Sequence, residues 1–233
     1  FNATGNASLS GTLTLKSVEL SAALAASRYE ERDIGNELAA FATATKAGDF
    51  TKYSCGNYFN LSISIPATDY TSAWSGTVKL VLADPDKFYA GYDSNACVSS
   101  HHWGVVVVGL PNVPMNKTDT TSGGYNSSKM HSTYLPKVRD AIITALNAKS
   151  ANLSLLAHQK FLSTGINSTG YNRYGSATGC SNNWAWQTNQ QIALLSECQI
   201  YGSIVWSSSG YDIGEANSQL AIFRHKRHNK IFG

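Results

Sequence analysis

Charged side chains are scarce in this sequence. Asp, Glu, Lys and Arg make up 14% of the 233 residues, against about 25% in an average soluble domain. Aromatic residues reach 11%, and the formal net charge is only +3. Charge-rich disordered segments and Lys/Arg-striped nucleic-acid binders both have a different composition. We therefore expect a folded protein with no nucleic-acid partner.

Long apolar runs are also missing. The longest one lies around 105–108, far short of the roughly 20 residues that cross a bilayer, so we expect no membrane insertion. The chain has no initiating Met, and residues 231–233 complete no recognisable pattern. We therefore expect a piece of a longer polypeptide. The basic residues of 224–230 suggest a solvated loop, with contact to phosphate or lipid as the alternative.

The four cysteines form no C-x-x-C pair, and no His lies at zinc-finger spacing from any of them. A structural metal is therefore not expected. Sequons at several asparagines, Asn116 and Asn126 among them, exceed the chance expectation only weakly. At this length four isolated cysteines are more often small buried residues than a disulfide framework, and free thiols and unmodified sequons are expected if the protein is made in a reducing cytoplasm. The cysteines are Cys55, Cys97, Cys180 and Cys198.

Motifs for catalysis are lacking as well. The sequence contains no H-E-x-x-H, G-x-S-x-G, P-loop or G-x-G-x-x-G pattern. His101 and His102 precede a run of valines, and one of them could serve as a general base or a ligand, although a strand-end histidine more often bonds a loop carbonyl. The acidic pairs could act as acid/base couples but also suit turns beside Pro or Gly. These pairs are Asp84 with Asp86 and Asp212 with Glu215.

Patterning changes along the chain. Residues 1–16 read as a short strand or extended arm, and 17–47 as helical in two pieces, the second capped by Asp33. Alternating apolar residues predict strands over 61–65 and 78–82. The continuous apolar run at 103–110 predicts a central strand that is buried on both faces.

The second half of the chain predicts more helix. An apolar stripe indicates a helix from 134 to 149. We also expect short helices over 153–162 and 188–198, and a late strand around 200–206. Together these elements predict an α+β fold with a mixed sheet and segregated helices, preceded by a helical or extended N-terminal arm. The expected organisation is an attachment segment at 1–47 and an α+β domain at 48–233.

One loop-rich segment stands out by its chemistry. Residues 171–186 read YNRYGSATGCSNNWAW, in which aromatic side chains alternate with Asn, Ser and Gly. This mixture suits contact with carbohydrate or protein surfaces, but it also suits the core of a loop-rich domain, with the tryptophans as anchors. The candidate ligand surface comprises Tyr171, Asn172, Tyr174, Asn182, Asn183, Trp184, Trp186 and Tyr211.

At these residues the chain resembles a family of poorly characterised domains found in bacteriophages and prophages of gut Firmicutes. The stretches that carry the resemblance include DKFYAGYDSNACVSSHHWGVVVV (86–108), TGYNRYGSATGCSNNWAW (169–186) and QIALLSECQIYGSIVWSSSGYDIGEANSQLAIF (191–223). Further matching stretches lie at 115–138 and, more weakly, at 47–59.

The resemblance implies a phage particle protein with a C-type-lectin-like fold. The W-L-R and G-V-R-P strands that close the family's fold are absent here, so the lectin-like domain is expected to be truncated at its C-terminus. The E-P-N and Q-P-D triplets of calcium-dependent lectins are also absent, so calcium-mediated sugar binding does not carry over. The resemblance supplies no catalytic residues and no cofactor.

The leading hypothesis is a non-enzymatic virion structural protein without cofactors. It is displayed on the particle as a capsid decoration, collar or tail-fibre component, and its partners are copies of itself and other virion proteins. A host-surface glycan or protein could be a further partner. Two alternatives stay open: an extracellular glycan-active enzyme that uses Asp212 and Glu215 or His101, and a secreted lectin-like adhesin.

Overall fold

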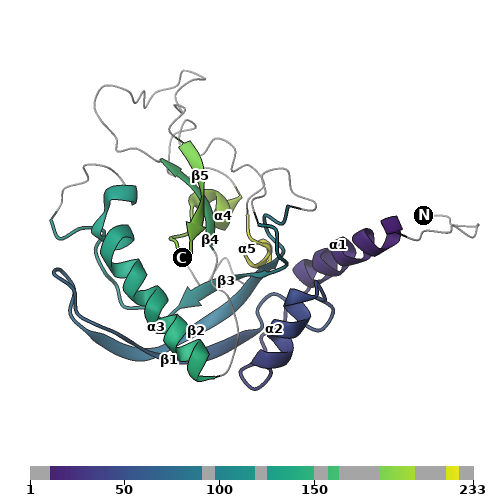
Figure 1. Ribbon diagram of the computed structural model, residues 1–233, viewed down its shortest axis with the longest axis horizontal. Coiled ribbons are helices and arrows are strands. Elements are labelled where there is room, and N and C mark those ends of the chain that lie inside the picture. Colours follow the sequence, from purple (N-terminus) through teal and green to yellow (C-terminus); the bar gives the residue numbers. More distant parts are fainter. Residues whose placement is uncertain are drawn as a thin grey trace, which may run out of the picture.

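The computed structural model describes residues 11–90, 98–118, 125–149, 157–162, 184–202 and 219–225. It is an α+β structure built around a three-stranded sheet of order β1-β2-β3, with a two-stranded β4-β5 sheet beside it (Figure 1). The strands are β1 (Tyr58–Ile65), β2 (Trp74–Pro85), β3 (Trp103–Val108), β4 (Ala157–Leu162) and β5 (Trp184–Gln190). The helices are α1 (Gly11–Ser27), α2 (Leu38–Lys46), α3 (Leu135–Ala148), α4 (Glu197–Tyr201) and α5 (Ala221–Arg224). A 3₁₀ turn, Tyr125–Ser127, and a π-helical turn, Met130–Tyr134, precede α3.

The three-stranded sheet follows from alternating side chains. In β1, every second residue from Phe59 to Ile65 is buried, and the residues between them are exposed. Its antiparallel register places Phe59 opposite Leu80 and Leu61 opposite Val78, so the apolar residues of both strands share one face. The predicted strands at 61–65 and 78–82 are confirmed.

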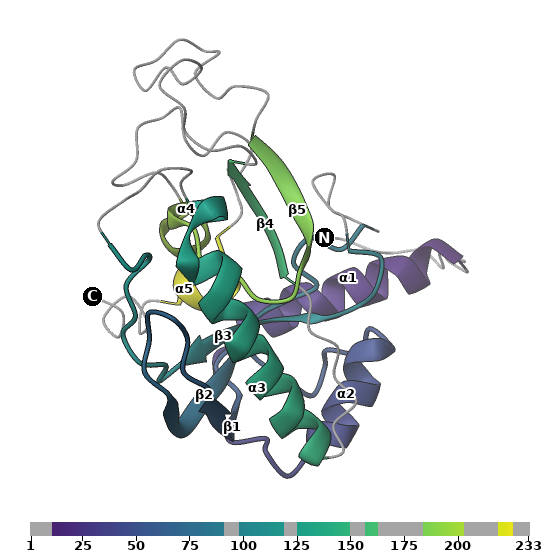
Figure 2. The same ribbon diagram turned by 60° about the vertical axis from the view of Figure 1, so that its left-hand side comes forward.

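Helix α3 crosses this apolar face of the sheet (Figure 2). Its buried residues recur at helical spacing, as the sequence predicted, and Pro136 lies in the first turn, where a missing N–H costs nothing. The buried stripe consists of Leu135, Val138, Ile142 and Leu146, none more than 4% exposed. The core of the molecule lies between α3 and the sheet.

The N-terminal helices belong to the same core. Ala22 and Ala25 of α1 and Phe41 of α2 are each at most 5% exposed and pack in one cluster with the sheet residues. These three side chains of the expected attachment segment at 1–47 are therefore buried within the chain itself. Residues 11–16 also differ from expectation, because they form the first turns of α1 and not an extended arm.

Asp33 does not cap the second helix. It lies in a bridge with Tyr58, and its Oδ1 accepts a hydrogen bond from the Gly35 N–H at 2.7 Å. The helix begins later, at Leu38. Asp33 thus stabilises a local turn, which is the other common use of an aspartate in this position.

The valine strand is also placed differently. β3 pairs only with β2 among the described strands and so lies at the edge of the sheet, not at its centre. Val106 is buried, but Val105 is 36% exposed. Both described sheets are antiparallel, so the expected mixed sheet is wrong for these strands.

Two predicted helices are wrong in the second half. Residues 157–162 and 184–190 are strands that pair with each other, so each supplies the other's backbone hydrogen bonds. Helix α4 follows later and includes Ile200 and Tyr201, which the sequence assigned to a strand. No helix in the described part of the chain is long and apolar enough to span a bilayer.

Candidate functional site

Charged and polar side chains cluster at the C-terminal end of β2. The turn after Pro85 places two residues other than glycine in the left-handed region, Asp86 at φ 52° and Phe88 at φ 65°. Such conformations cost free energy and persist only where surrounding contacts hold them. The contacts here come from two buried carboxylates, one on each side of Pro85.

Asp84 joins β2 to the C-terminal helix α5. Its side chain is 4% exposed, and Oδ2 accepts a hydrogen bond from the Ala221 N–H at 2.8 Å. The Arg224 guanidinium lies 3.7 Å from the same oxygen. Burial raises the pKa of Asp84 to about 6, although the nearby cations oppose this shift. The carboxylate therefore links segments that are 137 residues apart.

Asp86 joins the same turn to the start of β3. Its Oδ2 lies 2.6 Å from His101 Nδ1, and its Oδ1 accepts a hydrogen bond from the His102 N–H at 2.8 Å. The His101 ring stacks on Tyr89 at 4.3 Å between centroids and meets Phe50 edge-on. A carboxylate that orients an imidazole is the pairing by which many hydrolases position a general base.

His102 has a different environment. Its Nδ1 lies 2.9 Å from the Ser100 carbonyl oxygen, and its Nε2 lies 2.5 Å from that of Lys87. Both ring nitrogens thus face backbone carbonyl oxygens. His102 fastens the turn to the chain before β3.

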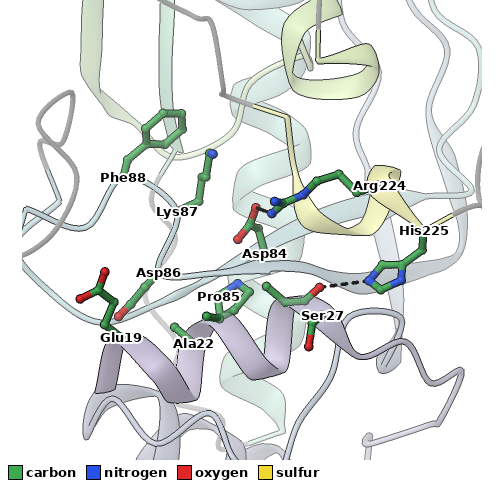
Figure 3. A pocket seen from close by; sticks show the side chains of 12 residues that line it. Glu19, Ala22, Ser27, Asp84, Pro85, Asp86, Lys87, Phe88, Arg224 and His225 are labelled. Carbon is green, nitrogen blue, oxygen red and sulfur yellow. Dashed lines mark hydrogen bonds and ion pairs between the residues drawn. The ribbon is translucent and has the colours of Figure 1, made fainter. Parts of the chain in front are cut away.

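A cavity of about 540 Å³ opens beside this turn, between α1, the end of β2 and α5 (Figure 3). The His225 ring closes one side of it, with Nε2 3.0 Å from the Ala26 carbonyl oxygen near the end of α1. We call this the charged cavity because acidic and basic side chains both line it. The ionisable lining residues are Glu19, Asp84, Asp86, Lys87, Arg224 and His225.

A second hollow of about 600 Å³, here called the apolar groove, lies between β3, α3 and the segment that leads into α4. Val105, Leu194 and Leu195 line it, and each is 36–37% exposed. Leu135 and Ile142 contribute its α3 wall. The ionisable residues that line it are Lys87 and His102, and neither is acidic.

The third surface is the outer face of α1, formed by Leu20 and Leu24. These side chains are 59% and 54% exposed. They lie four residues apart and therefore on one side of the helix, while Ala22 and Ala25 are buried on the opposite side. Figure 1 shows α1 extending away from the sheet toward its N-terminal end.

The sequence-predicted ligand surface falls mainly outside the described residues. Trp184 and Trp186 lie in β5, where their backbones pair with Leu162 and Lys160. The other members are outside the described part of the chain, as are Asp212, Glu215 and Trp206. These other members are Tyr171, Asn172, Tyr174, Asn182, Asn183 and Tyr211.

Of the catalytic candidates, the structure brings Asp86 and His101 together and directs Asp84 to another partner. Asp84 and Asp86 are therefore not a couple. The sequence missed the two C-terminal members of the charged cavity, Arg224 and His225, because their basic cluster looked like a solvated loop. That interpretation is wrong for His225, which is half-buried against α1 and contacts Tyr29 at 5.7 Å between rings.

Cys55 is a free thiol, as expected, and is fully buried. Its Sγ lies 3.3 Å from the Ala83 carbonyl oxygen, and burial raises the pKa of the thiol, which suits a core residue. Cys198 is buried, and Cys97 and Cys180 lie outside the described residues. The described part of the chain has no cluster of three or more His, Cys, Asp or Glu residues that could hold a metal ion.

Comparison with known proteins found no match: no family model, curated protein or solved structure matches this chain.

Proposed function

We propose that this chain is a non-enzymatic structural protein of a bacteriophage particle, which attaches through the outer face of α1 and displays the α+β body. The observation that carries the proposal is that α1 turns small side chains toward the core and large apolar side chains toward solvent. In the part of this helix whose side chains are described, Ala22 and Ala25 are buried, whereas Leu20 and Leu24 are more than half exposed. A rigid helix that presents apolar side chains to solvent is suited to dock on another protein.

Helix α1 is held firmly enough to act as such an element. The Phe50 N–H donates to Ser21 Oγ at 3.2 Å, on the inner side of the helix. Just after the helix, Arg28 donates to the carbonyl oxygens of Thr51 and Tyr53 at 2.9 and 3.2 Å. With the His225 contact to Ala26, these bonds fix the C-terminal half of α1 to the body.

The chemistry beside α1 also supports a structural role. Asp84 accepts from a backbone N–H of α5, and Asp86 accepts from the chain before β3. Both buried carboxylates thus join distant segments of the fold. Such links suit a protein that must keep its shape outside the cell.

The resemblance to phage and prophage domains supports the remaining parts of the proposal. These are assembly in the bacterial cytoplasm, a final location on the particle surface, and partners among the virion proteins and copies of this chain. The C-type-lectin-like form of the fold, and contact with a host surface through 171–186 and Tyr211, belong to the same proposal.

Incorporation into particles tests this function. A phage that encodes Leu20→Glu with Leu24→Glu is expected to form particles that lack the protein, because two charges then lie in the docking surface. Met115→Glu is the matched control, since Met115 is 40% exposed and lies on neither α1 nor the groove. Quantitative mass spectrometry of purified particles measures the copy number. A wild-type copy number for the α1 double variant would contradict the proposal.

A second candidate is favoured by the Asp86–His101 contact. An oriented imidazole could act as a general base in an extracellular glycan-active enzyme. The test is cleavage of host cell-wall polysaccharide by the purified chain, with His101→Gln as the inactive partner and His131→Gln as control. Cleavage that His101→Gln abolishes would replace the structural proposal with this one.

A further inference from the structure

The charged cavity contains a buried carboxylate with one unpaired oxygen. The Asp84 side chain is 6% exposed, and its Oδ2 holds both of its contacts, with the Ala221 N–H and with the Arg224 guanidinium. Its Oδ1 has no hydrogen-bond partner in the described part of the chain. Buried carboxylate oxygens normally accept hydrogen bonds. Because Asp84 lines the cavity, a molecule inside the cavity is in a position to supply the missing donor.

Hydrogen-bond donors lie directly beside this carboxylate. Arg224 Nη2 is 3.7 Å from Asp84 Oδ2, which is too far for a hydrogen bond. The Arg224 side chain is 56% exposed, and its guanidinium donates no hydrogen bond to the other described residues. A guanidinium carries five N–H donors in one plane. Figure 3 shows the Arg224 guanidinium and the Asp84 carboxylate directed toward each other, so a ligand that reaches one also reaches the other.

The rest of the cavity wall combines further charges with apolar surface. Glu19 adds a negative charge and Lys87 a positive one. Both oxygens of Asp86 already have partners, His101 Nδ1 and the His102 N–H. A volume of about 540 Å³ falls within the range of small-molecule sites, which join apolar walls to a few convergent polar groups. The apolar lining residues are Ala22, Ala23, Ala26, Pro85 and Phe88.

The neighbouring opposite charges select against a charged ligand. An ammonium group that approached Asp84 Oδ1 would also lie beside the Arg224 guanidinium, and a carboxylate or phosphate that approached Arg224 would lie beside Asp84. In each case repulsion offsets attraction. A hydroxyl group carries no charge and both donates and accepts hydrogen bonds. Two adjacent hydroxyls therefore suit this pair, one as donor to Asp84 and the other as acceptor from Arg224.

We propose that the charged cavity binds an uncharged sugar residue. Adjacent hydroxyls of the sugar donate to Asp84 Oδ1 and accept from Arg224, and the apolar C–H face of the ring lies against Phe88 and the alanines of α1. The inference goes beyond the proposed function, which places contact with a host surface at 171–186 and Tyr211. It does not depend on docking through α1.

NMR titration of the full chain with monosaccharides tests the site. The uncharged probes are glucose, galactose and N-acetylglucosamine. Glucosamine and galactosamine are their cationic counterparts, and glucuronate and galacturonate are their anionic ones. Because burial raises the pKa of Asp84 to about 6, the titrations are run well above that pH, where its carboxylate is ionised. At least one uncharged sugar is expected to shift the backbone amide signals of 22–27 and 221–225 in a saturable way, and its charged counterparts to bind at least about tenfold more weakly.

Three variants change the cavity in different ways. Arg224→Met removes the donors from an exposed side chain. Asp84→Asn keeps an oxygen for the Ala221 N–H but puts an amide N–H₂ in place of the unpaired oxygen. Ala23→Trp places a bulky side chain in the cavity from an exposed position of α1. Each variant is expected to weaken sugar binding at least about tenfold.

Two matched controls lie outside the cavity. Arg139→Met removes an arginine of α3 that also contacts an aspartate, Asp140, and Ala39→Trp adds the same bulk at an exposed position of α2. Both controls are expected to bind sugar like the wild type. Circular dichroism checks the folding of every variant.

Three results would overturn the site: no uncharged sugar shifts these amides, a charged counterpart binds as tightly as the uncharged sugar, or a folded Arg224→Met or Ala23→Trp variant binds like the wild type. Particle incorporation is a separate measurement. If no sugar binds but particles still lose the α1 double variant, the proposed function stands without this site. If a sugar binds but particles keep that variant, the site stands and the proposed function falls.

Discussion

Helices α1 and α3 both pack against the sheet, but they use their large side chains in opposite ways. Helix α3 directs Leu135, Val138, Ile142 and Leu146 inward, and none of the four is more than 4% exposed. Helix α1 directs Ala22 and Ala25 inward and leaves Leu20 and Leu24 in solvent. The same sheet thus supports one helix that completes the core and one that presents an apolar face outward.

This difference separates stability from assembly. Removing a large side chain from α3 leaves a cavity in a closely packed core, because the surroundings relax only partly. Removing one from the outer face of α1 leaves nothing behind but water. Sequence variation in α3 should therefore affect folding, whereas variation on the outer face of α1 should affect docking.

The largest expected effect is on α3. Ile142→Ala should lower the free energy of unfolding by about 2–5 kcal/mol, since Ile142 is 2% exposed and packs in the core. Urea unfolding followed by circular dichroism measures it. A loss within experimental error would show that α3 is as dispensable to the core as the outer face of α1.

Asp84 gives the next largest effect, on the α1 side of the sheet. Asp84→Asn keeps an acceptor for the Ala221 N–H, whereas Asp84→Ala leaves that donor without its partner. We expect the alanine variant to be less stable than the asparagine variant by about 1–3 kcal/mol. Equal unfolding midpoints in urea for the two variants would contradict this role for the carboxylate.

The pH dependence of stability also distinguishes the two regions. The end of β2 beside α1 contains the buried Asp84, whereas α3 buries no carboxylate. Burial raises the pKa of Asp84 from 3.8 to about 6, so between these values the folded protein holds a proton that the unfolded chain has released. The free energy of unfolding should therefore fall as pH rises from about 4 to about 6, by at most about 1.4 kcal/mol per pH unit from this group.

Asp84→Asn should lack this component of the pH dependence. Urea unfolding of both proteins at several pH values between 4 and 7 measures the difference between them. The difference should grow in favour of the asparagine variant as pH rises. A constant difference over this range would mean that Asp84 keeps an ordinary pKa in the folded protein.

The smallest expected effect is on the outer face of α1. Leu20→Ala and Leu24→Ala should each change the free energy of unfolding of the monomer by no more than about 0.5 kcal/mol, because both side chains are more than half exposed. The measurement is made at a concentration where the chain is monomeric. A loss as large as that of Ile142→Ala would show that these leucines belong to the core.

The periodicity of apolar residues predicted the elements that pack on the buried face of the three-stranded sheet. Alternation located most of β1 and the middle of β2, and the apolar stripe located α3, because burial on one side leaves a regular pattern in the sequence. The valine run of β3 predicted a strand but gave it the wrong place. A continuous apolar run indicates that both faces of the strand are partly buried. It does not indicate which strands lie beside it, so it cannot distinguish an edge strand from a central one.

The elements in the second half of the chain are harder to predict from sequence, and the reason is physical. Strands β4 and β5 show little alternation, and their register rests on pairing with each other, which sequence patterns do not record. Both ends of helix α4 are marked in the sequence. Ser196 and Gln199 form a capping box at its start, and Gly202 ends it in the left-handed conformation.

The candidate site was predictable only in part. Asp84, Asp86 and His101 could be named as candidates, because carboxylates and imidazoles are the side chains that acid/base chemistry uses. Their partners could not, since Ala221 is 137 residues from Asp84 and His225 reaches α1 from the other end of the chain. Such contacts follow from the packing of the whole fold.

The claim that α1 docks through its outer face is tested most directly by photo-crosslinking. A photoreactive amino acid at position 24 should give adducts with another protein chain in assembled particles. The same group at Asn147, which is exposed on α3, should give none. Mass spectrometry identifies the adducts and the residues that they join. Adducts from position 24 alone are the result that the account predicts, and assembled particles without any adduct from position 24 would contradict it.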